Sequence, residues 1–243
     1  MTENTKLTGK TALITGGSKG IGLGIAESLI EQGMKVGITS RSKEAADQAA
    51  ASLNQIKADS AIGIEADVRS LEAQQNSVQK VIDKWGQLDV LVANAGLGHF
   101  ASIEDMTEKQ WHDVIDINLT GVFNSVKASI PALKNSEGYI ITIASLAGTN
   151  FFANGAAYNA SKFGLVGFTQ AIMLDLRQKG IKVSTIMPGS VATYFNGHTP
   201  NDADAWKIQP EDLGQMTVDL LKMNPRTLPS KVEVRPSMPP KRS

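Results

Sequence analysis

The sequence predicts a single α/β domain of the Rossmann type, with a doubly wound parallel sheet and helices on both faces. Short apolar runs rich in β-branched residues alternate with longer amphipathic stretches, which is typical of such a sheet. No repeat or low-complexity linker interrupts the alternation, and 243 residues are enough for one domain with a substantial core. We therefore treat residues 1–243 as one domain.

Each expected strand is short, rich in β-branched residues and followed by turn or helix residues. In chain order the strands are KTALIT at 10–15, KVGITS at 35–40, SAIGIE at 60–65, LDVLVA at 88–93, GYIITIA at 138–144, IKVSTIM at 181–187 and KVEVR at 231–235. The expected helices lie at residues 20–32, 42–57, 70–85, 107–135, 155–179 and 210–223. Apolar residues at helical spacing, such as Val78, Val81 and Ile82, give these helices a face for the core.

Residues 188–209 depart from this alternation. They contain Pro188, Gly189, Gly197 and Pro200, followed by a polar run at 201–204. This composition predicts a loop with room for a short helix. Because ligands of open α/β sheets bind at the carboxyl ends of the strands, we predict that 188–209 is a substrate loop.

Composition and charge disfavour several classes of function. Lys and Arg total 24, as do Asp and Glu, so the chain has no general attraction for nucleic acid or an anionic membrane. With no cysteine and three scattered histidines, neither disulfides nor metal chemistry are expected. The first ten residues lack a signal pattern, and no apolar run is long enough to span a bilayer. We expect a cytoplasmic protein without nucleic-acid, membrane or metal partners.

A glycine-dense segment, TGGSKGIG at residues 15–22, joins the first strand to the first helix. Glycine there lets the backbone turn tightly and approach a pyrophosphate, whose charge lies against the positive end of the helix. The spacing TGxxxGxG differs from the GxGxxG of two-domain dehydrogenases and from the P-loop of nucleotidases. The segment predicts a dinucleotide site with contacts from Gly16, Ser18, Lys19, Gly20, Ile21 and Gly22.

The end of the second strand indicates which nucleotide binds. An acidic residue there would hold the ribose 2′-hydroxyl of NAD, whereas an arginine accommodates the extra phosphate of NADP. Ser40 and Arg41, with Lys19 in the glycine segment, suit a 2′-phosphate that no carboxylate opposes. Although both cations could be solvated surface charges, we predict NADP(H).

Tyr158 and Lys162 stand four residues apart on a predicted helix, downstream of Ser145. Positions i and i+4 share one helix face, so the lysine ammonium can approach the tyrosine phenol. A free phenol titrates near about pH 10, and a neighbouring cation lowers that pKa. The pair therefore predicts a general acid or base. Taken singly, Tyr158 could be packing, Ser145 could begin a turn, and Asn118 could cap or kink its helix.

In its motifs the chain resembles the short-chain dehydrogenase/reductase family, in the shorter single-domain branch. The motifs cover nearly the whole chain: TGGSKGIG at 15–22, Asp67 with Val68, ANAG at 93–96, Asn118, Ser145, YNASK at 158–162 and PGSVAT at 188–193. One position differs, because the family's usual NNAG begins here with Ala93. We expect the backbone beside the cofactor to tolerate that change.

The resemblance implies a role for each catalytic residue. Tyr158 would exchange a proton with the substrate oxygen during hydride transfer to or from a nicotinamide, and Ser145 would hold that oxygen. Lys162 would bind the nicotinamide ribose and lower the Tyr158 pKa, while Asn118 would anchor a water that relays protons. Further cofactor contacts are implied at Asp67, Val68, Asn94, Gly96, Pro188, Val191 and Thr193, besides Tyr158 and Lys162 themselves.

These residues predict an NADPH-dependent reductase of ketones or aldehydes, because a neutral acid, a hydroxyl and a cation beside a hydride donor are what carbonyl reduction requires. One alternative is a 3-oxoacyl-[acyl-carrier-protein] reductase, although the carrier-docking arginines often found in that group do not occur between Asn118 and Lys134. The other is a non-catalytic NADP-binding regulatory protein, which we would expect to lack the tyrosine, lysine or serine.

Aromatic residues gather in the segments after Gly96, Ser145 and Gly189. Packing against the domain would explain them, but they favour a carbonyl or alcohol substrate with substantial apolar surface. The aromatic and imidazole side chains of these three segments are His99, Phe100, Phe151, Phe152, Tyr194, Phe195, His198 and Trp206.

The helices at 107–135 and 155–179 resemble those that pair across subunits in the family, so we predict a homotetramer or homodimer.

Overall fold

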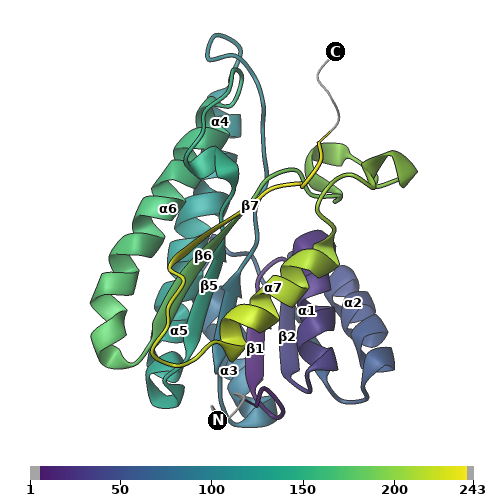
Figure 1. Ribbon diagram of the computed structural model, residues 1–243, viewed down its shortest axis with the longest axis vertical. Coiled ribbons are helices and arrows are strands. Elements are labelled where there is room, and N and C mark those ends of the chain that lie inside the picture. The colour runs from purple at the N-terminus through teal and green to yellow at the C-terminus, as the bar shows by residue number, and fades with distance from the viewer. Residues whose placement is uncertain (1–5, 240–243) are drawn as a thin grey trace.

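The computed structural model describes residues 6–239, so residues 1–5 and 240–243 of the predicted domain lie outside it. A parallel sheet of seven strands runs through it in the order β3-β2-β1-β4-β5-β6-β7 (Figure 1). The predicted fold class is confirmed. The strands are β1 (Thr11–Ile14), β2 (Lys35–Ser40), β3 (Ala61–Glu65), β4 (Val90–Ala93), β5 (Tyr139–Ile143), β6 (Lys182–Pro188) and β7 (Lys231–Val234).

Helices cover both faces of the sheet (Figure 1). They are α1 (Gly20–Glu31), α2 (Lys43–Ile56), α3 (Leu71–Trp85), α4 (Glu108–Ile115), α5 (Gly121–Ser136), α6 (Ala156–Leu176) and α7 (Pro210–Lys222). Successive strand residues point to opposite faces, so Ile14 joins the core under α1, α2 and α7, whereas Leu13 joins the core under α3, α5 and α6. This alternation explains why buried parallel strands have continuous apolar sequences.

The helix predicted at 107–135 is interrupted. A capping box between Thr107 and Gln110 starts α4, and a π-helical turn at Asp116–Thr120 separates α4 from α5. The backbone N–H of Gly121 bonds to the Asp116 carbonyl, five residues back, instead of four. Asn118 lies within this turn and is fully buried. The apolar spacing on both sides gave no sign of the extra residue.

Within residues 6–239 we find no helix that is both long and apolar enough to cross a membrane. The predicted cytoplasmic location stays a prediction.

Candidate active site

A cavity of about 780 Å³ runs along the carboxyl ends of strands β1 to β6. It lies beside the β1–β4 pair, where the strand order reverses, as is usual for ligand sites in open α/β sheets. Most of the predicted site residues line it: Gly16, Ser18, Lys19, Gly20, Ile21, Ser40, Arg41, Val68, Asn94, Gly96, Ser145, Tyr158, Lys162, Pro188, Val191 and Thr193. Gly22, Asp67 and Asn118 do not line it.

Close packing of the loops after β1 and β4 explains the glycine segment. Gly16 has φ +63°, and a Cβ there would lie 2.9 Å from the Cα of Ala95. The Asn94 side chain donates to the carbonyls of Thr15 at 2.9 Å and Gly16 at 3.1 Å. A Cβ on Gly22 would lie 2.6 Å from that same amide nitrogen. Gly22 therefore makes room for Asn94, and its predicted contact with a cofactor stays a prediction.

The glycine segment leaves donors that suit a dinucleotide. Helix α1 starts after Lys19 without any side-chain cap, so its first N–H groups have no side-chain acceptor there. With the helix dipole, these groups favour an anion such as a pyrophosphate. The hydroxyl of Thr39, in the same lining, is buried and has no hydrogen-bond partner among the described residues. The residues present therefore fit a phosphate-bearing dinucleotide.

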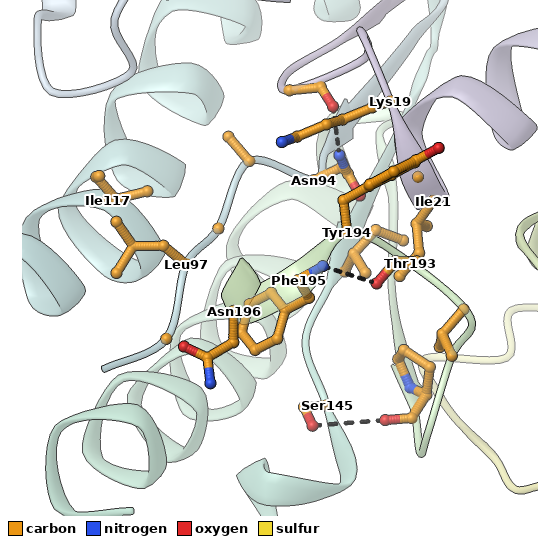
Figure 2. Close-up of a pocket in the computed structure, with 18 of the residues that line it drawn as sticks. Lys19, Ile21, Asn94, Leu97, Ile117, Ser145, Thr193, Tyr194, Phe195 and Asn196 are labelled. Carbon is orange, nitrogen blue, oxygen red and sulfur yellow. Dashed lines mark hydrogen bonds between the residues drawn. The ribbon is translucent and has the colours of Figure 1, made fainter. Parts of the chain in front are cut away.

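The two predicted phosphate-binding cations, Lys19 and Arg41, line the same cavity. The Lys19 ammonium lies 5.9 Å from the centre of the Tyr194 ring, which reaches across from the loop after β6 (Figure 2). Arg41 helps to lower the pKa of Asp67, so a carboxylate does lie near it. The expectation that no carboxylate opposes this site is therefore wrong.

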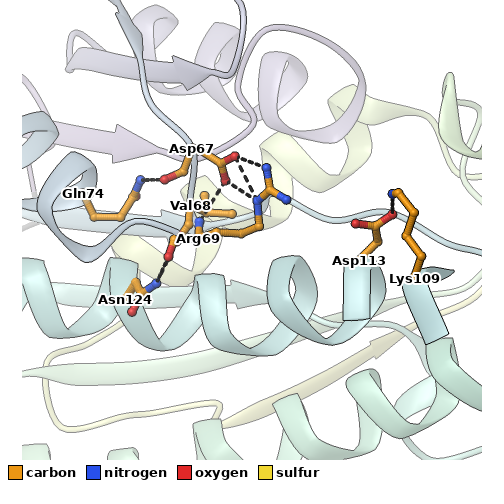
Figure 3. A network of polar contacts seen from close by, with 7 residues as sticks. All are labelled: Asp67, Val68, Arg69, Gln74, Lys109, Asp113 and Asn124. Carbon is orange, nitrogen blue, oxygen red and sulfur yellow. Dashed lines mark hydrogen bonds and ion pairs between the residues drawn. The ribbon is translucent and has the colours of Figure 1, made fainter. Parts of the chain in front are cut away.

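That carboxylate is already held by another arginine. Asp67 accepts hydrogen bonds from the Arg69 side chain on both oxygens, and this contact is the main cause of its lowered pKa (Figure 3). Asn124 on α5 ties the loop down by donating to the carbonyls of Val68 and Arg69, both at 3.0 Å. Asp67 is thus neutralised before any cofactor contact. We did not anticipate Arg69, although a base two residues after an acid was a visible signal.

Ser145, Tyr158 and Lys162 meet at the middle of the cavity. Ser145 begins a 3-10 turn after β5, and its hydroxyl, which donates to the Pro188 carbonyl at 3.4 Å (Figure 2), lies beside the Tyr158 phenol. Lys162 is buried one helical turn after Tyr158 on α6, with its ammonium 5.7 Å from the centre of the tyrosine ring. The Lys162 Nζ donates to the carbonyl of Ile143 at 3.0 Å. The predicted grouping of the three side chains is present.

The electrostatics differ from the prediction that Lys162 lowers the Tyr158 pKa. Burial raises the pKa of Tyr158, and the neighbouring Ser145 hydroxyl opposes this in part. Burial also lowers the pKa of Lys162 to about 8. The ammonium is directed to the Ile143 carbonyl, so its charge does not offset the desolvation of the phenol. In this structure Tyr158 is a neutral phenol at pH 7, as a proton donor must be.

Asn118 holds the loop beside these residues. Its Oδ1 accepts from the Leu97 backbone N–H at 2.8 Å, and its Nδ2 donates to the Leu97 carbonyl at 2.8 Å and to the Ser161 hydroxyl at 3.0 Å. The side-chain amide is thus engaged within the protein and fixes the chain next to Gly96. The implied role of Asn118 in proton relay stays a prediction.

The predicted substrate loop covers one side of the cavity. It contains 3-10 turns at Phe195–Gly197 and Asp202–Asp204, and it returns to the sheet through a bridge between Val191 and Ile208. Buried Asp204 bonds to His198 Nε2 and Lys207 Nζ, each at 2.5 Å. His198 and Lys207 line the cavity. Lys207 was not predicted as a site residue, because a single lysine in a polar loop belongs to no recognisable motif.

A family model described as short chain dehydrogenase matches residues 10–204. The chain belongs to the short-chain dehydrogenase/reductase family. An uncharacterized oxidoreductase of Staphylococcus saprophyticus is 33% identical to it over 232 residues, which is 95% of this chain and 99% of that protein.

Solved structures of this short-chain dehydrogenase/reductase fold align over almost the whole chain. The alcohol dehydrogenase of the archaeon Thermococcus sibiricus, complexed with 5-hydroxy-NADP, has a TM-score of 0.89 and 28% identity, covering 96% of this chain and 99% of that one. A 3-ketoacyl-(acyl-carrier-protein) reductase of Brucella melitensis, complexed with NADH, has a TM-score of 0.86 and 27% identity, covering 95% and 98%. The chain is therefore an oxidoreductase of a family that uses nicotinamide cofactors.

Proposed function

We propose that this short-chain dehydrogenase/reductase reduces a ketone or aldehyde to an alcohol with NADPH. The observation that carries the proposal is the half-buried, neutral Tyr158, which lines one cavity with Ser145, Lys162, Lys19 and Arg41. When bound, the nicotinamide supplies the hydride. Tyr158 donates the proton to the substrate oxygen, and Ser145 holds that oxygen by a hydrogen bond.

Reduction is the direction that these side chains favour. A phenol whose pKa is raised keeps its proton at neutral pH and can give it to a developing alkoxide. Lys162, with its pKa near 8, keeps most of its charge at pH 7 beside the tyrosine. Lys162 also holds the nicotinamide ribose in this proposal.

The preference for NADPH rests on the cavity's basic residues. Arg41 and Lys19 supply two cations, and the nearby Asp67 is paired with Arg69, so little free negative charge repels a 2′-phosphate. The similar proteins do not decide between the cofactors, because the archaeal alcohol dehydrogenase was solved with 5-hydroxy-NADP and the Brucella reductase with NADH.

The similarity to a 3-ketoacyl-(acyl-carrier-protein) reductase supports a second candidate, reduction of an acyl carrier-bound 3-ketone. Helix α5, where carrier-docking arginines would be expected, has none. We rank this candidate below a reductase of free ketones or aldehydes. The third candidate is a non-catalytic NADP-binding protein. The presence of Ser145, Tyr158 and Lys162 in one cavity argues against it.

We also infer a homotetramer or homodimer. Helices α5 and α6 leave large apolar side chains partly exposed, including Phe123, Phe163 and Leu174. Such a face is suited to a second copy of the chain. Light scattering should give a mass of two or four chains, and a monomer at micromolar concentration would contradict this inference.

The proposed activity is tested by following NADPH oxidation with a panel of β-ketoesters, aryl ketones, diketones and quinones, plus an acetoacetyl carrier-protein thioester. We expect turnover of free carbonyl compounds, with the alcohol as product and NADPH used in preference to NADH. If the protein binds NADPH but does not oxidise it in the presence of any of these carbonyl compounds, the result would support the non-catalytic alternative. Turnover confined to the thioester would support the second candidate.

A further inference from the structure

Three phenylalanines from three different loops form a cluster beside the reacting tyrosine, and two of them contact its ring. Phe100 follows β4, Phe152 follows β5 and Phe195 lies in the loop after β6. The Phe100 ring centre lies 5.4 Å from that of Tyr158, and the Phe195 ring centre lies 5.7 Å from it. Phe100 also contacts Phe152 at 5.9 Å and Phe195 at 6.3 Å. These separations are those of interacting aromatic pairs.

The rings close one side of the cavity. Tyr158 and Phe195 line it, whereas Phe100, which contacts both of them, and Phe152, which contacts Phe100, are outside the lining. Phe100 and Phe195 converge on the backbone at Gly98, where an added Cβ would lie 2.8 Å from the tip of each ring. Figure 2 shows Phe195 extending toward the loop that carries Leu97.

These rings are too exposed to be explained as core packing. Phe100 is 38% exposed, Phe195 37% and Phe152 47%, while the large side chains of the two cores are almost wholly buried. Exposed apolar rings that touch each other next to a catalytic group form a surface that gains stability when an apolar ligand covers it. The basic side chains of the adjoining loop, His198 and Lys207, are already bound to Asp204 and leave this side without a strong anion site.

We propose that Phe195, held by its contact with Phe100, determines specificity by receiving an aromatic ring attached to the substrate carbonyl, so that the substrates are aryl ketones or aryl aldehydes. A carbonyl oxygen held by Ser145 and Tyr158 places its substituent against the rings that contact Tyr158. A planar aromatic substituent makes an edge or offset contact with the Phe195 ring, which a saturated ring of similar size does not make. This inference rests on the proposed carbonyl reduction.

The test uses two matched pairs of small molecules. Acetophenone and cyclohexyl methyl ketone, as substrates, differ only in the aromaticity of the ring. The alcohols 1-phenylethanol and 1-cyclohexylethanol, titrated calorimetrically into the protein saturated with NADP, measure binding without the difference in carbonyl reactivity. We expect the aromatic alcohol to bind about three- to tenfold more tightly, as one aromatic contact would give.

Three substitutions by leucine distinguish a requirement for aromatic rings from a requirement for apolar side chains in general. Phe100→Leu and Phe195→Leu should each reduce the aromatic preference by about three- to tenfold, mainly through KM, with NADPH binding unchanged. Phe151→Leu is the control, because Phe151 is 87% exposed and makes no ring contact with Phe100, Tyr158 or Phe195. It should keep the wild-type preference.

Equal binding of the two alcohols by the wild type, or a preference that neither Phe100→Leu nor Phe195→Leu changes, would overturn the inference. If aliphatic ketones are reduced without aromatic preference, this inference fails and the proposed reductase function stands. If no carbonyl compound is reduced, the proposed function fails, and an aromatic preference in the alcohol titrations would still locate the ring-binding surface.

Discussion

The two ends of the cavity are built in different ways. The cofactor end is made of backbone at strand termini: the Gly17 N–H bonds to the Thr39 carbonyl at 3.0 Å, and Asn94 ties the loop after β4 to Thr15 and Gly16. The substrate end is made of side chains on loops, namely exposed phenylalanines and the buried Asp204 with its two basic partners. Backbone interactions fix the first end, whereas a few replaceable side chains determine the second.

Ser145 lies where the two ends meet, so its substitution should have the largest effect. Ser145→Ala removes the hydrogen bond to the substrate oxygen and should lower kcat by about 100-fold or more. The NADPH dissociation constant, measured by fluorescence titration, should not change. Thr149→Val is the matched control, because it removes a hydroxyl near the end of the same turn. A kcat within about twofold of wild type for Ser145→Ala would argue against a substrate contact.

Arg41 tests the chemistry of the cofactor end. Arg41→Gln, alone and with Lys19→Gln, should raise the KM for NADPH by about 10- to 100-fold, because charge-assisted contacts to a phosphate are lost. The KM for NADH should stay within about twofold. Lys43→Gln is the control, because Lys43 is exposed two residues further on and pairs with Asp47. Equal effects on both cofactors would remove the basis for the NADP(H) preference.

A substitution at Asp204 tests whether the conformation of the substrate loop at 188–209 depends on this one side chain. Asp204→Asn weakens the links to His198 and Lys207 and should raise the substrate KM by about tenfold with little change in NADPH binding. His198 and Lys207 hold the pKa of Asp204 far below its usual range. The carboxylate therefore stabilises the wild type fully above about pH 4, and this contribution is lost as pH falls further. Unfolding midpoints of wild type and variant should converge in acid, and a constant difference would contradict the account.

Substitution of Lys162 should increase the stability of the fold while removing a residue of the active site. Burial lowers its pKa from 10.5 to about 8, so a charged Lys162 destabilises the folded state by about 3 kcal/mol. Lys162→Met loses the bond to Ile143 and should still raise the free energy of unfolding by about 2 kcal/mol at pH 7. Between pH 8 and 10.5 the wild-type lysine is neutral when folded and charged when unfolded, so the advantage of the variant should shrink. A variant less stable than wild type at pH 7 would contradict this account.

The sequence predicted most of the residues that line the cofactor end of the cavity, because the glycine segment and the strand ends have fixed positions in this fold. It failed where contacts across the chain decide the outcome. Arg69 neutralises Asp67, Gly22 makes room for Asn94, and burial raises the Tyr158 pKa. None of these depends on local spacing.

The substrate end could be predicted only as a set of aromatic residues. The sequence placed Phe100, Phe151 and Phe195 together as candidates, but the ring contacts with Tyr158 involve Phe100 and Phe195 and leave Phe151 exposed. Which side of a loop faces the cavity depends on its tertiary packing, and no periodic pattern records it. The π-helical turn around Asn118 was missed for a similar reason.

The most direct test of the central claim, that Tyr158 protonates a carbonyl reduced by NADPH, is the turnover of Tyr158→Phe beside that of Tyr139→Phe. The control removes a phenol that is bonded to Ser184 within the sheet. We predict that Tyr158→Phe binds NADPH as the wild type does but loses at least about 100-fold in kcat, while Tyr139→Phe stays active. Comparable turnover by the two variants would contradict the assignment of Tyr158 as the proton donor.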